Sequence, residues 1–124
     1  MKLIIFLDKE TSLSDEEKTE LAKLSSGNLY GQLTDDEKLK LDDDEESFLA
    51  GVFVETSIRS EEKKPIVFNY YKIDRTPSII FLSENEMVYH WESIVTLSEI
   101  VKSMVSYFRI LKMSSMDYDY DPEE

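Results

Sequence analysis

The chain has 124 residues, of which 41% are hydrophobic, and it carries a formal net charge of −13. A chain of this length is expected to form one domain with a single packed core. It contains no cysteine, which excludes disulfides, thiolate zinc sites and thiol redox chemistry. No apolar run approaches the roughly 20 residues that a membrane helix needs, so we expect a soluble, cytoplasmic protein.

The negative charge is concentrated in two segments. Residues 35–46 carry eight acidic side chains against two lysines, and residues 117–124 carry five acidic side chains with no basic one. The rest of the chain is nearly neutral. Such charge opposes direct binding to nucleic acid or to an anionic membrane, and it favours another protein with a basic surface as the partner.

The first predicted elements are a strand and two helices. Residues 2–7 (KLIIFL) form a continuous apolar run, typical of a strand buried on both faces. Capping boxes begin at Ser14 and at Thr34, and each predicts a helix start. The first helix ends at residues 25–28, and the second lies in an acidic insertion at about residues 28–47.

A second strand and a short helix are predicted next. Residues 48–58 (FLAGVFVETSI) read as another strand buried on both faces. Pro65 suits the first turn of a helix, because its missing N–H costs nothing there. The inner face of that helix is predicted to contain Ile66, Tyr70 and Ile73.

The last predicted elements are a hairpin and a long helix. Residues 78–82 and 87–91 read as strands that are joined by a longer loop containing the polar residues SENE. The stretch Thr96-Leu97-Ser98-Glu99 is predicted to cap the long helix. The apolar residues that follow Thr96, from Leu97 to Leu111, recur with the period of one helix face.

This order of elements resembles the thioredoxin fold. In that family a proline with a cis peptide bond stands just before the strand that begins the closing hairpin, and Thr76-Pro77 occupies that position. The segment LIIFLDKETSLSDEEK is similar to the family's first strand, its C-x-x-C loop and the start of its helix. The resemblance places the two cysteine positions at Thr11 and Ser14.

The resemblance implies an α/β fold with a central mixed four-stranded sheet flanked by helices. Residues 1–113 would form this domain, including the acidic insertion, and residues 114–124 would form a disordered acidic tail. Neither hydroxyl at Thr11 or Ser14 can form a disulfide or become a nucleophilic anion at neutral pH. The chain is therefore expected not to be an enzyme.

Other chemistry finds little support in the sequence. His90 is the only histidine, and no cysteine or second histidine is available to complete a transition-metal site. There is no glycine-rich phosphate loop, and no visible base accompanies Ser14. We expect neither a metal nor a cofactor.

Two functions stay open. The first is an adaptor or inhibitor that binds another protein through the surface around Thr11, Ser14, Thr76 and Pro77, through the acidic segments, or through both. In an extended tail, Tyr118 and Tyr120 would point to one side and the aspartates to the other, which suits an apolar groove with basic residues.

The second is an acidic nucleic-acid mimic that blocks the basic groove of a DNA- or RNA-binding enzyme. A mimic needs carboxylates spread over one rigid face, whereas here they cluster in an insertion and a tail.

The low glycine content and the many Lys, Ile and Tyr residues suit an AT-rich genome such as a viral one, and host cytoplasm would then be the location. The sequence leaves the oligomeric state open.

Overall fold

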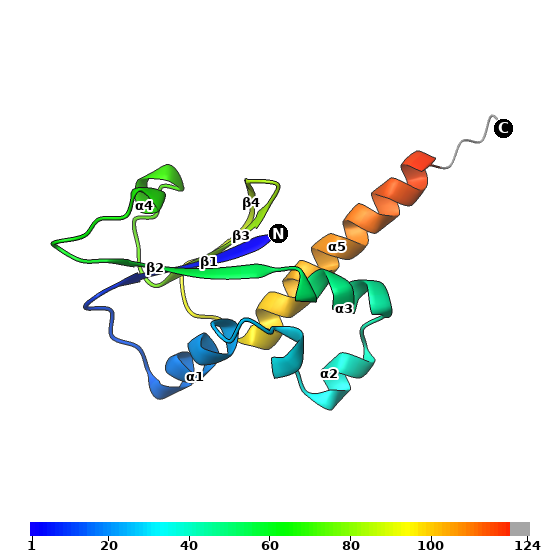
Figure 1. Ribbon diagram of the computed structural model, residues 1–124, viewed down its shortest axis with the longest axis horizontal. Coiled ribbons are helices and arrows are strands. Elements are labelled where there is room, and N and C mark those ends of the chain that lie inside the picture. Colours follow the sequence, from blue (N-terminus) through cyan, green and yellow to red (C-terminus); the bar gives the residue numbers. More distant parts are fainter. Residues whose placement is uncertain (120–124) are drawn as a thin grey trace.

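The computed structural model describes the backbone of residues 1–119 and the side chains of residues 1–114. The chain folds into helices and strands, with a run of helices between the first two strands and a hairpin before the last helix (Figure 1). In order they are β1 (Lys2–Asp8), α1 (Asp15–Leu24), a short 3-10 helix η1 (Tyr30–Gln32), α2 (Asp35–Leu39), α3 (Asp43–Ala50), β2 (Phe53–Arg59), α4 (Ile66–Tyr70), β3 (Ser78–Ser83), β4 (Glu86–Trp91) and α5 (Leu97–Asp119).

The strands form one mixed four-stranded sheet with the order β2-β1-β3-β4. β1 runs parallel to β2 in a continuous register, from Lys2 opposite Phe53 to Asp8 opposite Arg59. β1 and β4 both pair with β3 in the antiparallel direction. The predicted mixed four-stranded sheet is confirmed, and β1 and β3 are its two inner strands.

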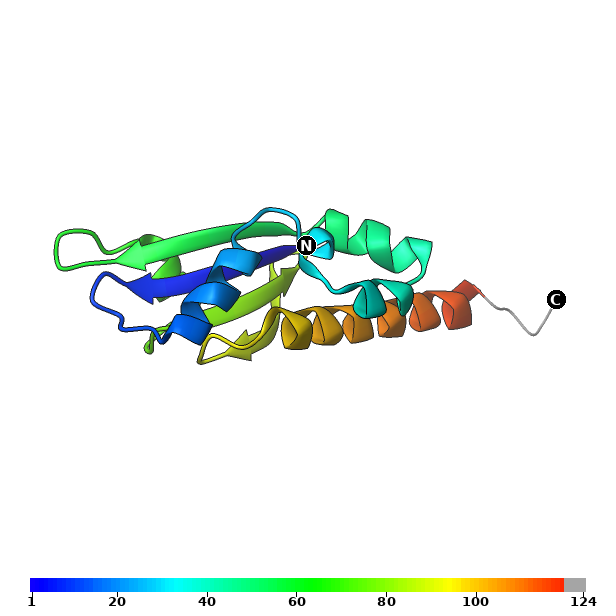
Figure 2. The same ribbon diagram turned by 90° about the horizontal axis from the view of Figure 1, so that it is seen from below.

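Helices cover both faces of the sheet (Figures 1 and 2). Leu3 and Ile5 of β1 point to the face covered by α1, α3 and α5, where the larger core cluster lies. Ile4 and Phe6 point to the opposite face, where they pack with Phe68 of α4. The continuous apolar run of β1 is thus explained, because both of its faces are buried.

The apolar stripe of the last helix is confirmed over its first half. Leu97, Ile100, Val101, Met104 and Val105 of α5 are all buried against the sheet. Further along, the ring of Phe108 stacks on that of Phe48 at a centroid distance of 4.7 Å, while Leu111 is already 39% exposed. No helix among the described residues is both long enough and apolar enough to cross a membrane.

The acidic insertion is helical. The capping boxes predicted at Ser14 and Thr34 are both present, and a third at Asp42 begins α3. Glu45 of α3 is only 5% exposed, and Arg109 of α5 binds its two carboxylate oxygens through Nε and Nη2 at 2.5 and 3.1 Å. This ion pair fixes the insertion to the last helix.

The prediction of a buried strand over residues 48–58 is wrong at its start and in its burial. Phe48 belongs to α3, which ends in a turn at Gly51, and β2 begins only at Phe53. β2 is an edge strand of the sheet rather than an inner one. Phe53 and Ile58 are therefore 62% and 50% exposed.

The predicted inner face of α4 is also wrong. Ile66 and Tyr70 are 82% and 70% exposed, and the buried residues are Phe68 and Ile73. Ile73 lies in the loop after α4, so its burial cannot be predicted from the spacing of residues along the helix.

The hairpin loop is shorter than predicted. Only Glu84 and Asn85 lie between β3 and β4, and both have positive φ angles, of 52° and 69°. This is the backbone that a two-residue turn between twisted antiparallel strands requires.

The backbone of residues 114–119 continues α5, so this part of the predicted tail is helical rather than extended. Tyr118 belongs to this last stretch of the helix. Tyr120 and residues 121–124 lie outside the described residues.

Candidate functional site

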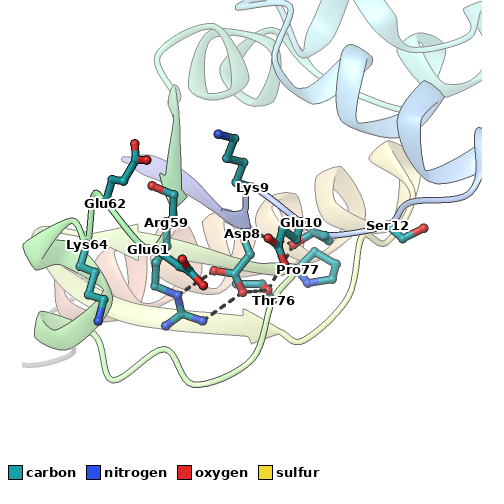
Figure 3. A pocket seen from close by; sticks show the side chains of 12 residues that line it. Asp8, Lys9, Glu10, Ser12, Arg59, Glu61, Glu62, Lys64, Thr76 and Pro77 are labelled. Atoms are coloured by element: carbon teal, nitrogen blue, oxygen red, sulfur yellow. Dashed lines mark hydrogen bonds and ion pairs between the residues drawn. The ribbon is translucent and has the colours of Figure 1, made fainter.

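A hollow of about 800 Å³ lies at the carboxyl ends of the parallel strands β1 and β2 (Figure 3). Its wall is formed by the loop after β1, the loop after β2 and the segment that leads into β3. The lining residues are Asp8, Lys9, Glu10, Thr11, Ser12, Arg59, Ser60, Glu61, Glu62, Lys64, Thr76 and Pro77.

The floor of the hollow is an ion pair between the last residues of the two strands. Arg59 Nε lies 2.7 Å from Asp8 Oδ1, and Arg59 Nη2 lies 3.1 Å from Asp8 Oδ2. The Arg59 guanidinium also lies over the ring of Phe68, 4.8 Å from its centroid. Arg59 is therefore held by both a carboxylate and an aromatic face, which fixes its position.

Two threonines extend this network to the segment before β3. Thr76 Oγ1 donates to Asp8 Oδ2 at 2.7 Å, and it lies 3.3 Å from Thr11 Oγ1. Thr11 Oγ1 in turn accepts the backbone N–H of Asp8 at 2.9 Å. The hydroxyls of both threonines are thus engaged within the molecule.

The network changes the acid–base behaviour of its charged members. The hydrogen bonds from Arg59 and then from Thr76 hold the pKa of the Asp8 carboxyl below its usual range, although partial burial opposes them. The hydrogen bond to Asp8 raises the pKa of Arg59. A carboxylate with a lowered pKa that is already bound by two donors is a poor proton acceptor at neutral pH.

Three of the predicted site residues come together in this hollow. Thr11, Thr76 and Pro77 all line it, and the Thr76–Pro77 peptide bond is cis. Ser14 does not line it. Its hydroxyl accepts the backbone N–H of Glu17 at 3.1 Å and caps α1.

The two tail tyrosines are not part of this hollow as the structure describes it. The backbone of Tyr118 lies in the last turns of α5, at the opposite end of the molecule from the loop after β1 (Figures 1 and 2). Tyr120 lies outside the described residues.

The sequence interpretation missed Asp8 and Arg59, which are the centre of the site. A signal for them was present, because each is the charged residue that directly follows an apolar strand segment. The carboxyl ends of parallel strands meet at one edge of a sheet and commonly carry a ligand site in open α/β sheets.

Thr76 is half-buried beside the hollow, and its backbone polar groups are unpaired in the described part of the chain. Within the described residues, neither its N–H nor its C=O has a hydrogen-bond partner. The described residues contain no group of three or more His, Cys, Asp or Glu side chains that could hold a metal ion. The hollow therefore presents a free pair of backbone groups beside side chains that are already hydrogen-bonded to one another.

No protein-family model and no curated protein matches the chain. Solved structures do match. Thioredoxin-2, a component of the malaria parasite's protein secretion machinery, superposes with a TM-score of 0.54 at 14% identity over 83% of this chain and 79% of its own. Thioredoxin 1 from the thermophilic eubacterium Thermosipho africanus superposes with a TM-score of 0.52 at 11% identity over 90% of this chain and 99% of its own.

The chain has a thioredoxin-like fold. It lacks the C-x-x-C motif, because it contains no cysteine. Identities this low establish the thioredoxin-like fold alone, so function has to be argued from the site.

Proposed function

We propose that this thioredoxin-like chain is not an enzyme and works by binding another protein, as an adaptor or an inhibitor. An extended segment of that protein would occupy the hollow beside Thr76. The observation that carries the proposal is the unpartnered N–H and C=O of Thr76 at the edge of a hollow of about 800 Å³. An extended peptide can satisfy both groups with its own backbone, as in β-strand addition.

The polar side chains of the hollow support binding rather than bond-breaking. A nucleophilic hydroxyl needs a nearby base to accept its proton. Thr11 Oγ1 instead accepts a backbone N–H from Asp8, and the Asp8 carboxylate is held by Arg59. These side chains are hydrogen-bonded to one another and so form a rigid surface against which a peptide segment can lie.

The charges around the hollow suit a segment that contains both signs. Glu10, Glu61 and Glu62 line it together with Lys9 and Lys64. All five are exposed, so they would act at the rim, where charges affect the association rate and the choice of partner more than the affinity.

The arrangement of the acidic residues does not favour a nucleic-acid mimic. Asp44 is paired with Lys112 at 2.6 Å, and the buried Glu45 is paired with Arg109. Two carboxylates of the acidic run are thereby neutralised by cations of α5, and one of them, Glu45, is also buried. Asp35 and Asp36 remain exposed and suit a basic patch on the bound protein.

The proposal is tested with peptides selected from a random displayed library against the pure protein. Ser12 is exposed, lines the hollow and makes no side-chain hydrogen bond within the described residues, so Ser12→Trp should fill the hollow without unfolding the chain. Ser106 is an exposed serine on α5, in a second hollow beside Tyr89, so Ser106→Trp is the matched control.

We expect Ser12→Trp to weaken binding of the selected peptides by at least about tenfold, which corresponds to about 1.4 kcal/mol. Ser106→Trp should leave the affinity unchanged. A library that yields no binding peptide, or peptides whose affinity falls only with Ser106→Trp, would exclude the hollow beside Thr76 as the binding site.

A further inference from the structure

The edge strand β2 exposes a row of backbone N–H and C=O groups. The N–H of Phe53 donates to Met1 O at 3.1 Å, and Arg59 O accepts the N–H of Lys9 at 2.8 Å, so the backbone groups of these two residues point toward β1. The register between them is continuous. Because hydrogen-bonding direction alternates along a strand, the N–H and C=O groups of Val54, Thr56 and Ile58 point away from the sheet.

This edge lacks the features by which proteins usually prevent an edge strand from pairing with another chain. β2 lies at one edge of the sheet (Figure 2), and it contains no proline and no bulge. Its two charged residues are already neutralised within the chain, Glu55 by Lys2 at 3.3 Å and Arg59 by Asp8 at 2.7 Å. The other edge strand, β4, pairs with β3 through a register shift between Phe81 and Leu82, which makes that pairing irregular. An unprotected edge strand is a template for pairing with another strand.

The side chains of β2 are also unusually exposed for their type. Ile58 is 50% exposed and Phe53 is 62% exposed, and Thr56 between them is exposed as well. Val54 packs on the larger core cluster. By the alternation of a strand, Thr56 and Ile58 lie on the same face of the sheet as Val54.

We infer that β2 pairs with β2 of a second copy of this chain, antiparallel and about a twofold axis at Thr56. This goes beyond the proposed peptide binding and does not depend on it. With the axis at Thr56, Val54 lies opposite Ile58 of the second copy and Thr56 lies opposite itself. It is the one register in which all three outward residues form hydrogen-bonded pairs.

The second copy fits this edge in its side chains as well as its backbone. The pairing places the exposed Ile58 against Val54 of the second copy, which joins two β-branched side chains on one face. On the other face, Phe53 lies opposite Arg59 of the second copy, and Glu55 lies opposite Ser57. No two like charges are directly opposed. The two four-stranded sheets then form one continuous sheet.

Sedimentation equilibrium of the full chain over a wide concentration range gives the first test. We expect a species of twice the 14.5 kDa chain mass for the unmodified protein and for Thr56→Val, which keeps a β-branched side chain and every backbone group. Thr56→Lys places two like charges opposite each other at the axis, so we expect it to remain at the mass of one chain. Because Thr56 is exposed, this variant should keep the circular dichroism spectrum of the parent.

Cysteine crosslinking tests the register, since the chain has no cysteine of its own. Hydrogen-bonded antiparallel pairs have Cα atoms about 5.5 Å apart, which a disulfide can bridge. On oxidation Thr56→Cys should form a covalent dimer, and so should the double variant Val54→Cys/Ile58→Cys. Val54→Cys alone should not. A single-chain mass at every concentration, a dimeric Thr56→Lys, or crosslinking by Val54→Cys but not by Thr56→Cys would overturn the inference.

Discussion

Arg59 binds Asp8 through two nitrogens and thereby joins the carboxyl ends of two parallel strands that are 51 residues apart in the sequence. The same carboxylate accepts the hydroxyl of Thr76 at 2.7 Å. Asp8 is therefore the point where β1, β2 and the segment before β3 are tied together, and it shapes the wall on which the proposed partner segment would lie.

Asp8→Asn should destabilise the protein in a pH-dependent way. The pKa of Asp8 is lowered in the folded state, so its contribution is complete above the unfolded pKa of about 3.9 and is lost as the pH falls through the lower folded value. Because both partners are about one-third exposed, we expect a loss of only about 1 kcal/mol near neutral pH. Urea unfolding of both proteins should show this difference shrinking in strong acid; a difference independent of pH would contradict the account.

Phe68→Ala should cost about 3–5 kcal/mol, because Phe68 is 3% exposed and its ring meets Phe6 edge-on at 5.0 Å. Ile66→Ala, two residues earlier, removes a side chain that is 82% exposed and should change the free energy of unfolding by less than about 0.5 kcal/mol. Chemical denaturation of the two variants measures both values. Equal losses would mean that α4 packs on a different face.

Arg109→Met should destabilise the protein by about 2 kcal/mol, because it leaves the buried carboxylate of Glu45 without its cation. Lys112→Met is the matched control on the same helix. It breaks the pair with Asp44, in which the two side chains are 44% and 65% exposed, and should have no measurable effect. Thermal unfolding compares them, and a larger loss for Lys112→Met would show that α3 is held to α5 in another way.

The pure protein should not accelerate the reduction of insulin by dithiothreitol. Thiol–disulfide exchange needs a thiolate, and the chain has no cysteine. The turbidity assay with a thioredoxin as positive control measures this directly. Acceleration above the rate with dithiothreitol alone would contradict the proposal that the chain is not an enzyme.

The buried face of the long helix α5 could be predicted from the sequence, whereas the buried face of α4 and the start of β2 could not. The stripe that begins at Leu97 fixes α5 because it repeats over several turns. α4 has only five residues, too few to define a face, so packing against Phe6 decides that Phe68 is the inner residue. The start of β2 was missed because Phe48 and Leu49 are apolar in either a strand or a helix, and the cap at Asp42 is one acid among many.

The site could be predicted only in part for a related reason. Thr11, Thr76 and Pro77 follow from the resemblance in element order, and they do lie together. The pairing of Asp8 with Arg59 depends on the register of β1 and β2, which brings the last residue of each strand side by side. The register of two strands far apart in the chain cannot be read from a single sequence. The sequence does show a charged residue at the end of each apolar run.

The most direct test of peptide binding in the hollow is the backbone amide spectrum of the isotope-labelled protein during titration with a selected peptide. If the peptide pairs with the free backbone groups beside Pro77, the Thr76 amide should show the largest shift and gain protection from hydrogen exchange, with smaller shifts at Thr11 and Ser12. If the shifts centre instead on Tyr89 and Ser106, or if Thr76 does not move while the peptide binds, the hollow at the ends of β1 and β2 is not the binding site.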